Sequence, residues 1–507
     1  DSLTEVGSLS LTGTPLTSLD GLESLQTVDD LLYLYNNESL ISVEGLQSLR
    51  TVGGQLYLYN NDLLPSLTGL EALETVGSTL TISGVDGIAD LRPLSGLTSA
   101  NALYIASCDL IPDLSGLEGL TSLAGSLSIF GNNLQTSLNG LNNLGSVGGS
   151  VLISSHILDN ATGLEGLTSI GGDLNLGSYG YTFSTYQGLN NLATVGGNVY
   201  LSDGPVDMQG LNALTTVGSG FYAGGSTYTS VRGLDSLTSV GDRFQLNFTS
   251  PVSTVGLESV QTIGGSLVLE NVSDTAGLTG VQTIGGSLDV SGTGVTYSGL
   301  SALTSVGGDV SSLNHSCAGL SALQSIGGQL YLSRDNGAGL TSLQSLGGLY
   351  ASGVDPTAIN VTTISGGVTL MDAPAMTSLN QVTSIGGSIL VDGNIYSGAP
   401  LSSITGFQGL RTVGGGISMY HVDSLTSITG MSSLQSVAGE LYIYAWYVNN
   451  LSGFSQVQSL GGLRLLGTRL SNLNSFSNLR TINGDLDIQA AYLLSDATGL
   501  HGVRSVT

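Results

Sequence analysis

The chain has 507 residues, of which 76 are glycine and only 9% are charged, and its net charge is −27 because 37 acidic residues face ten basic ones, all arginine. This acidity excludes nucleic acid and anionic membranes as main partners, since both require a basic protein face. No stretch approaches the roughly 18 apolar residues of a membrane span, so we expect no membrane insertion in this segment.

One unit of sequence recurs along the whole chain. The stretch from Gly45 to Asn61 reads GLQSLRTVGGQLYLYNN, and its pattern is G-L-x-x-L-x-[ST]-[VI]-G-G-x-L-x-[LIV] followed by a variable arc. Clear copies run from Gly21 to Gly499, and with the degenerate copies near Gly96, Ile359, Val382 and Phe476 they make about 22 turns with a period of 20–27 residues. Periods of this length are typical of solenoids, whose turns bury their apolar faces by stacking.

The pattern within each turn predicts strands and corners, not helices. Leu56-Tyr57-Leu58 alternates between apolar and outward positions, which is the period of a strand. The Gly-Gly pairs, such as Gly53-Gly54, predict positive φ at a corner, and Asn-Asn pairs such as Asn60-Asn61 predict a left-handed corner after the strand. Leu46, Leu49, Val52, Leu56 and Leu58 are the predicted core of their turn.

The fold class that follows is all-β: a parallel β-helix, or solenoid, of about 22 turns. We expect residues 1–507 to form a single continuous solenoid, because no shift in composition marks a linker. The least regular part is residues 347–380, where the Gly-Leu start is lost, and a kink or bulge is expected there.

The repeat resembles the receptor L-domain, the leucine-rich β-helix of receptor ectodomains and of fungal cell-wall proteins. The matching pattern, L-x-x-L-x-x-[IV]-G-G-x-L-x-I, is clearest in residues 69–82 and 430–443. The resemblance implies the coil type and an extracellular setting, but this array is several times longer and nearly free of cysteine, so it implies no ligand and no binding residue. Ordinary leucine-rich repeats are the nearer alternative, although they place a helical or 3₁₀ arc where this chain has Gly, Ser and Thr.

Tyrosines gather at outward positions of the predicted strands. Such a column is either ordinary packing on a sheet surface or a contact face for another chain or a sugar, because tyrosine combines a large area with a polar tip. The candidate contact face comprises Tyr33, Tyr35, Tyr57, Tyr59, Tyr200, Tyr222, Tyr331, Tyr350, Tyr442 and Tyr444.

A second column holds Ser or Thr directly before the Val or Ile of nearly every turn, for example Thr51, Thr75 and Ser169. Stacked turns would make it a hydroxyl ladder. Its hydroxyls either satisfy backbone groups at the corner or form a flat array that binds ice or a crystalline polysaccharide, and we favour the first explanation.

No catalytic, cofactor or metal site is expected. The acids after Gly-Leu fall on alternate turns, which indicates avoidance of adjacent like charges and not metal ligation. The histidines His156, His315, His421 and His501 share no partner pattern, and no nucleophile elbow or phosphate loop is present. We therefore expect a protein that is not an enzyme.

Two further features are the cysteines and the glycosylation sequons, of which the sequons indicate a secreted glycoprotein. Cys108 and Cys317 lie too many turns apart for a disulfide between them, so buried free thiols are expected, with a link to another chain as the alternative. Seven sequons place candidate N-glycosylation in the variable arcs. They are Asn37, Asn160, Asn247, Asn271, Asn314, Asn360 and Asn450.

The sequence leaves three hypotheses open. The first is an extracellular structural rod that associates with itself, or with other structural proteins, in a coat, wall or filament. Its support is the long array, the tyrosines and ends that show no capping turn. The second is a cell-surface adhesin or carbohydrate-binding protein, with glycans as partners. The third, more remote, is an ice-binding protein.

Overall fold

The computed structural model describes residues 3–155, 157–176, 183–291, 295–312, 316–333, 335–393 and 401–506. It confirms the predicted class, an all-β parallel solenoid of about 21 turns. Among the described residues the helices are single 3₁₀ turns, none of which is long and apolar enough to cross a membrane.

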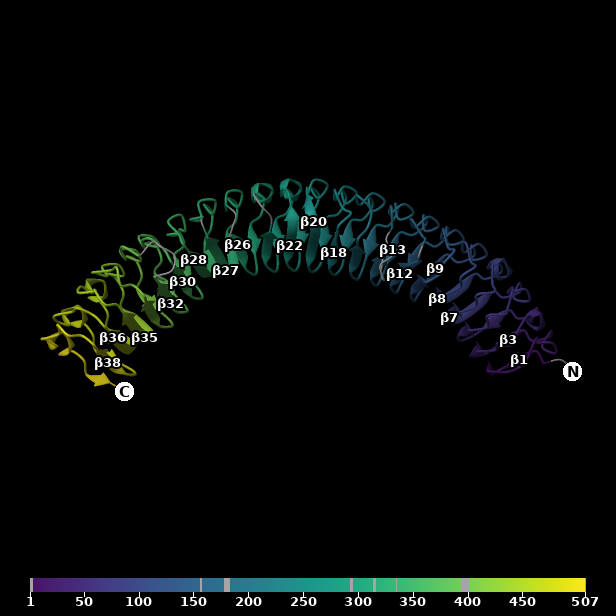
Figure 1. The fold of residues 1–507 in the computed structure, drawn as a ribbon, viewed down its shortest axis with the longest axis horizontal. Helices are drawn as coiled ribbons and strands as arrows, with labels where there is room; N and C mark the ends of the chain where they lie inside the picture. The colour runs from purple at the N-terminus through teal and green to yellow at the C-terminus, as the bar shows by residue number, and fades with distance from the viewer. Residues whose placement is uncertain are drawn as a thin grey trace. The chain divides into compact units, whose positions relative to one another are not determined.

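The chain forms two compact units. The first contains residues 1–265 and 269–272, and the second contains residues 266–268 and 273–507. In each unit the strands lie along one side of the stack and the connecting arcs along the other (Figure 1).

In the first unit each turn supplies a two-residue strand and then a longer strand. The two-residue strands are β1 (Glu5–Val6), β3 (Thr27–Val28), β5 (Thr51–Val52), β9 (Ser122–Leu123), β11 (Ser146–Val147), β13 (Ser169–Ile170), β15 (Thr194–Val195), β17 (Thr216–Val217), β19 (Ser239–Val240) and β21 (Thr262–Ile263). The longer strands are β2 (Leu9–Thr12), β4 (Leu32–Tyr35), β6 (Leu56–Tyr59), β10 (Leu127–Phe130), β12 (Val151–Ser154), β14 (Leu174–Leu176), β16 (Val199–Ser202), β18 (Phe221–Gly225) and β20 (Phe244–Val252). In two turns the short strand and the longer strand are continuous, which gives β7 (Thr75–Ser83) and β8 (Ser99–Ala106). The strand β22 (Leu267–Val272) has residues in both units.

The second unit repeats this arrangement. Its two-residue strands are β23 (Thr283–Ile284), β25 (Ser305–Val306), β29 (Thr363–Ile364), β31 (Ser384–Ile385), β33 (Thr412–Val413), β37 (Thr481–Ile482) and β39 (Ser505–Val506). Its longer strands are β24 (Leu288–Ser291), β26 (Val310–Ser312), β30 (Val368–Met371), β32 (Ile389–Asp392), β34 (Ile417–Tyr420) and β38 (Leu486–Gln489). The merged strands are β27 (Ser325–Ser333), β28 (Ser345–Ser352), β35 (Ser436–Tyr444) and β36 (Ser459–Leu466).

Successive turns pair in parallel and in register, so equivalent residues stack in columns. Leu32 pairs with Leu56, and Leu56 with Leu80. Register shifts in the merged strands, for example between Ile326 and Gln329 where β27 pairs with β28. On β28 the shift falls at Gly347, the residue at which the repeat pattern of the sequence becomes irregular.

The core is the stack of apolar columns inside the coil. The five predicted core residues of the turn from Gly45 to Asn61, namely Leu46, Leu49, Val52, Leu56 and Leu58, are each at most 1% exposed. Alternation in β6 buries its two leucines and turns its two tyrosines outward, as the period of a strand requires.

The prediction for the Gly-Gly pairs is wrong in its mechanism. Neither Gly53 nor Gly54 has a φ in the left-handed region. Glycine is required there because consecutive turns lie in close contact: a Cβ on Gly53 would overlap the carbonyl oxygen of Asp29, and one on Gly77 would overlap that of Gly53. The column of such glycines is the place where backbone packs directly on backbone.

Positive φ occurs instead at the glycine that opens the repeat. Gly69 has φ 109° and Gly163 has φ 111°. The side chain two residues later accepts a hydrogen bond from this glycine N–H, as Glu71 Oε2 does from Gly69 at 2.8 Å. The acids after Gly-Leu are therefore turn caps, which explains why Asn142 and Asn190 replace them in other turns.

The corner after the longer strand uses its two asparagines differently. Asn36 and Asn60 adopt the predicted left-handed conformation, with φ of 54° and 50°. Asn37 and Asn61 are buried. Asn61 Oδ1 accepts from the Asn37 N–H at 3.1 Å and Asn61 Nδ2 donates to the Leu34 carbonyl at 3.0 Å, so these amides form a buried ladder that satisfies backbone groups.

Short 3₁₀ turns replace the Gly-Leu turn in several coils. They are η1 (Glu44–Leu46), η2 (Arg92–Leu94), η4 (Ala276–Leu278), η5 (Ser298–Leu300), η6 (Ser452–Phe454), η7 (Asn474–Phe476) and η8 (Thr498–Leu500). Their presence corrects the argument that this chain lacks the 3₁₀ arc of ordinary leucine-rich repeats, and the fold is leucine-rich-repeat-like in this respect.

The glycine column leads to a stability prediction. Gly171→Ala should lower the free energy of unfolding by about 1–3 kcal/mol, because its Cβ would overlap the Gly148 carbonyl oxygen. Gly145→Ala is the matched control, since its Cβ would have the Thr121 oxygen as its neighbour at 3.6 Å. Urea unfolding followed by circular dichroism measures both, and equal stabilities would contradict the close contact.

The asparagine ladder leads to a second prediction. Asn61→Ala should cost about 2–3 kcal/mol of stability, because it leaves the buried Asn37 N–H without a partner and removes a buried donor to the Leu34 carbonyl. Asn133→Ala removes an exposed amide that donates to Asp109 at 2.7 Å and should change stability by less than about 0.5 kcal/mol. Thermal melting of the two variants distinguishes them, and a harmless Asn61→Ala would refute the ladder's role.

Candidate functional site

The most compact group of predicted contact residues lies on β4 and β6. Tyr33 pairs with Tyr57 and Tyr35 with Tyr59 in the strand register. The rings of Tyr33 and Tyr57 are stacked with centroids 4.7 Å apart, and those of Tyr35 and Tyr59 with centroids 5.4 Å apart. Stacking also joins Tyr33 to Tyr35 and Tyr57 to Tyr59, both at 5.6 Å. We call these four residues the tyrosine face.

The stacking decides which part of each ring is accessible. Interplanar angles of 11–20° mean that neighbouring rings cover each other's faces. The side chains are half-buried, and burial among the other rings raises the pKa of Tyr57. A partner therefore meets ring edges and hydroxyl groups, which suits hydrogen bonding and packing against a protein more than stacking of a sugar on a ring face.

The surroundings of the tyrosine face are uncharged. The equivalent positions of the flanking strands hold Ser10 and Thr12 on β2, which are exposed, and Thr81 and Ser83 on β7, which are buried. On a chain with a net charge of −27, this is a neutral area that another surface can cover without desolvating a charge.

The other predicted tyrosines form separate pairs. Tyr200 and Tyr222 are stacked at 5.2 Å, and Tyr331 and Tyr350 are tilted at 5.7 Å. Tyr442 packs against Tyr420 at 5.1 Å, while Tyr444 contacts Trp446 at 6.0 Å. The ten candidates are thus one four-ring cluster and several smaller groups, not one continuous surface.

The Ser and Thr column forms the predicted ladder. In the first unit it runs without a break through β9 to β21, pairing Ser146 with Ser169 and Thr194 with Thr216. The backbone-capping role falls to the column one residue earlier: the hydroxyls of Thr168 and Thr238 donate to carbonyls of the preceding turn, each at 2.9 Å. Beside the ladder, the glycine column leaves a shallow groove of about 550 Å³.

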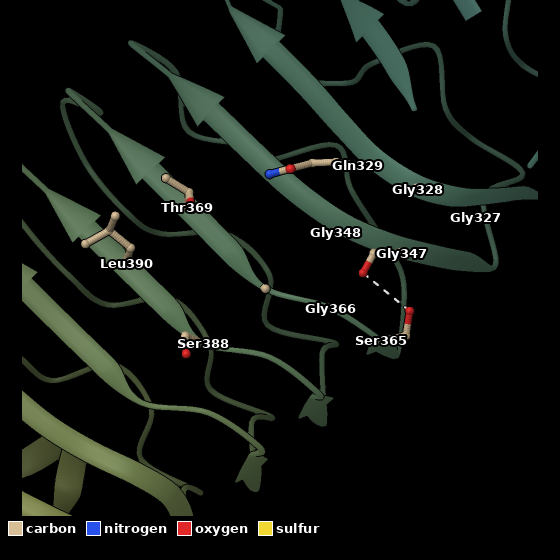
Figure 2. A pocket seen from close by; sticks show the side chains of 11 residues that line it. Gly327, Gly328, Gln329, Gly347, Gly348, Ser365, Gly366, Thr369, Ser388 and Leu390 are labelled. Carbon is tan, nitrogen blue, oxygen red and sulfur yellow. Dashed lines mark hydrogen bonds between the residues drawn. The ribbon is translucent and has the colours of Figure 1, made fainter. Parts of the chain in front are cut away.

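The second unit has a similar groove with a glycine floor. Figure 2 shows Gly327, Gly328, Gly347 and Gly348 along it, with Gln329 on β27, Thr369 on β30 and Leu390 on β32. The Ser365 hydroxyl already donates to the Gly347 carbonyl at 3.3 Å. The groove results from the close contact of the turns and brings together no reactive groups.

Three aromatic residues near the end of the second unit lie outside the repeat pattern and beside the predicted Tyr444. Trp446, Tyr447 and Tyr492 line a pocket of about 620 Å³ together with Arg469, and Tyr444 contacts Trp446. The chain has a single tryptophan, which was the one signal in the sequence that pointed to this turn.

The remaining titratable groups do not converge. Within the described part of the chain, no three His, Cys, Asp or Glu side chains could hold a metal ion. His421 Nδ1 lies 2.9 Å from Asp392 Oδ1 and His501 Nδ1 lies 2.6 Å from the Thr498 carbonyl, while His156 and His315 lie outside the described residues.

Cys108 and Cys317 are free and buried, as expected, and burial raises the pKa of each thiol to about 12, which argues against a link to another chain.

The seven sequons differ in their exposure and in the elements on which they lie. The Asn37 amide is buried in the ladder, which argues against a glycan there. Asn247 and Asn271 are exposed but lie within β20 and β22 and not in arcs. Asn360 and Asn450 are exposed, Asn160 is half-buried, and Asn314 lies outside the described residues.

Comparison with known proteins gives a likeness of fold alone. No protein-family model matches the chain, and no curated protein sequence matches it. Among solved structures, it is similar to an internalin (inlF) from Listeria monocytogenes, with 16% identity and a TM-score of 0.31 over 67% of this chain and 84% of that one. It is also similar to TLR13 in a complex with ssRNA13, with 16% identity and a TM-score of 0.31 over 93% of this chain and 86% of that one.

Both neighbours are leucine-rich-repeat proteins, and neither supports the receptor L-domain in particular. At these values the likeness carries no argument about partners. What this chain's own turns show is a leucine-rich-repeat-like parallel solenoid.

Proposed function

We propose that this protein is a secreted or cell-surface recognition protein, a solenoid without catalytic activity that binds another protein chain through the tyrosine face. The observation that carries the proposal is the four-ring cluster of Tyr33, Tyr35, Tyr57 and Tyr59 on two paired strands. The exposed sequons at Asn247, Asn360 and Asn450 support the extracellular setting.

The tyrosine face has the properties of an interface centre. Tyrosine is enriched where protein interfaces concentrate their binding energy. Each ring is held by its stacked neighbours and by the hydrogen-bonded register beneath it, so binding immobilises little additional side-chain freedom. The exposed hydroxyl groups of Ser10 and Thr12 on β2 add hydrogen-bonding groups beside the tyrosine face without the cost of burying charge.

A second copy of the chain is the alternative partner, and it would give the structural rod expected from the sequence. Its support is the same uncharged area, since two copies that each have a net charge of −27 repel each other overall. Self-association through the tyrosine face should therefore strengthen with salt, whereas binding between oppositely charged surfaces weakens.

A phage-displayed random peptide library panned on the purified chain tests the proposal. Peptides selected on the wild-type protein should bind Tyr57→Ser/Tyr59→Ser at least tenfold more weakly, about 1.4 kcal/mol, because the stacked cluster is lost. Leu134→Ser, at a position 51% exposed in an arc, is the control and should bind as the wild type does.

Sedimentation of the same three proteins identifies the partner class. A salt-strengthened dimer that the tyrosine variant loses would favour the structural rod, and a monomer that still binds the peptides would favour recognition of a different protein. Peptides that bind the tyrosine variant and the wild type equally, with both folded by circular dichroism, would refute the tyrosine face as a binding surface.

A further inference from the structure

Four successive turns of the second unit build one pocket from the residues that follow their longer strands. Asp423 follows β34, Trp446 and Tyr447 follow β35, Thr468 and Arg469 follow β36, and Tyr492 and Leu493 follow β38. The pocket has a volume of about 620 Å³, within the range of small-molecule sites. We call it the aromatic pocket.

The indole of Trp446 is held in a fixed orientation. Its Nε1–H donates to the Tyr444 hydroxyl at 3.2 Å, and its backbone N–H donates to Asp423 Oδ1 at 3.1 Å. A Cβ on Gly467 would lie 3.3 Å from the indole atoms Cδ2 and Cε3, so the glycine allows the ring to lie against the backbone. Trp446 is nevertheless 42% exposed. One part of the ring is thus packed while another part faces the pocket.

The other walls combine apolar area with a few polar groups. The guanidinium carbon of Arg469 lies 4.6 Å from the ring centroid of Tyr447, which holds that side chain over the ring. Tyr492 is 85% exposed. Thr468 is 1% exposed, and its hydroxyl oxygen has no hydrogen-bond partner among the described residues. A buried hydroxyl without a partner is costly unless a ligand or water supplies one.

The charges of the pocket cancel. Asp423 and Arg469 contribute one negative and one positive group, so neither an anion nor a cation gains a net attraction there. The net charge of −27 further disfavours anions. A purely apolar ligand would offer no hydrogen bond to the Arg469 guanidinium or to the unpaired Thr468 hydroxyl.

We propose that the aromatic pocket binds a neutral saccharide. The apolar C–H face of a sugar ring matches the open area of the Trp446 indole, and sugar hydroxyl groups supply both donors and acceptors. They can donate to the Asp423 carboxylate and accept from the Arg469 guanidinium, as a site with few well-placed polar groups requires. This site is independent of the tyrosine face, so each proposal can fail without the other.

Fluorescence provides a direct test, because Trp446 is the only tryptophan in the chain and its emission reports on the pocket alone. The whole protein is titrated separately with cellohexaose, chitohexaose, xylohexaose, mannohexaose and, as a different class of ligand, decaproline. At least one hexasaccharide should shift the emission saturably and protect Trp446 from acrylamide quenching, and decaproline should do neither.

Variants measured by calorimetry with the binding saccharide locate the site. Trp446→Ala should weaken binding at least tenfold, and Trp446→Phe, which keeps a ring, should retain part of the affinity. Asp423→Asn keeps the acceptor for the Trp446 N–H and should weaken binding several-fold through loss of the carboxylate charge. Val206→Ser, 59% exposed in an arc of the first unit, is the control and should bind as the wild type does.

Thr468→Val separates a binding role from a structural one. Removal of an unpaired buried hydroxyl should leave the melting temperature unchanged or raise it, while the affinity for the saccharide falls about fivefold. The proposal is overturned if no hexasaccharide affects Trp446, if decaproline binds in their place, or if folded Trp446→Phe and Asp423→Asn variants both bind as the wild type does.

Discussion

The spacing between stacked turns is the constraint on which the rest of this structure depends. Parallel strands lie about 4.8 Å apart. Consecutive turns can keep that distance along their whole path only where no side chain lies between them. At Gly53 and Gly77 the backbone of one turn lies against the carbonyl oxygen of the turn before it, with no room for a Cβ. The glycine column therefore allows the corners to keep the spacing that the hydrogen-bonded strands set.

Because successive turns stack in register, residues at the same position of the repeat form a column and have similar surroundings. Apolar lines such as Leu32, Leu56 and Leu80 close the core, and the Asn37 and Asn61 amides satisfy the backbone at the corner. On the outer surface, a residue type that recurs at the same position of two adjacent turns lies beside a copy of itself, one strand spacing away. Tyr33 and Tyr57 are stacked for this reason, and the aromatic pocket draws one wall from each of four turns.

The two proposed sites differ in what they leave accessible. In the tyrosine face the rings cover one another, so edges and hydroxyl groups meet the partner. In the aromatic pocket the indole of Trp446 is held by Tyr444, Asp423 and Gly467 and keeps an open area. Similar residue types therefore suit a protein surface in one place and a sugar ring in the other. A recognition protein that carries both would bind a partner and a saccharide at separate positions.

The sequence by itself determined the repeat, the parallel strands and the core columns, because a period of 20–27 residues with fixed apolar spacing allows few other folds. It also located the outward tyrosines, since alternation in a strand is a local property. Only the tertiary structure decided why Gly53 must be glycine and why Asn37 is buried, because these depend on the neighbouring turn. The aromatic pocket belongs to the same class: Asp423, Trp446, Arg469 and Tyr492 lie in different turns and share no motif, and stacking alone brings them together.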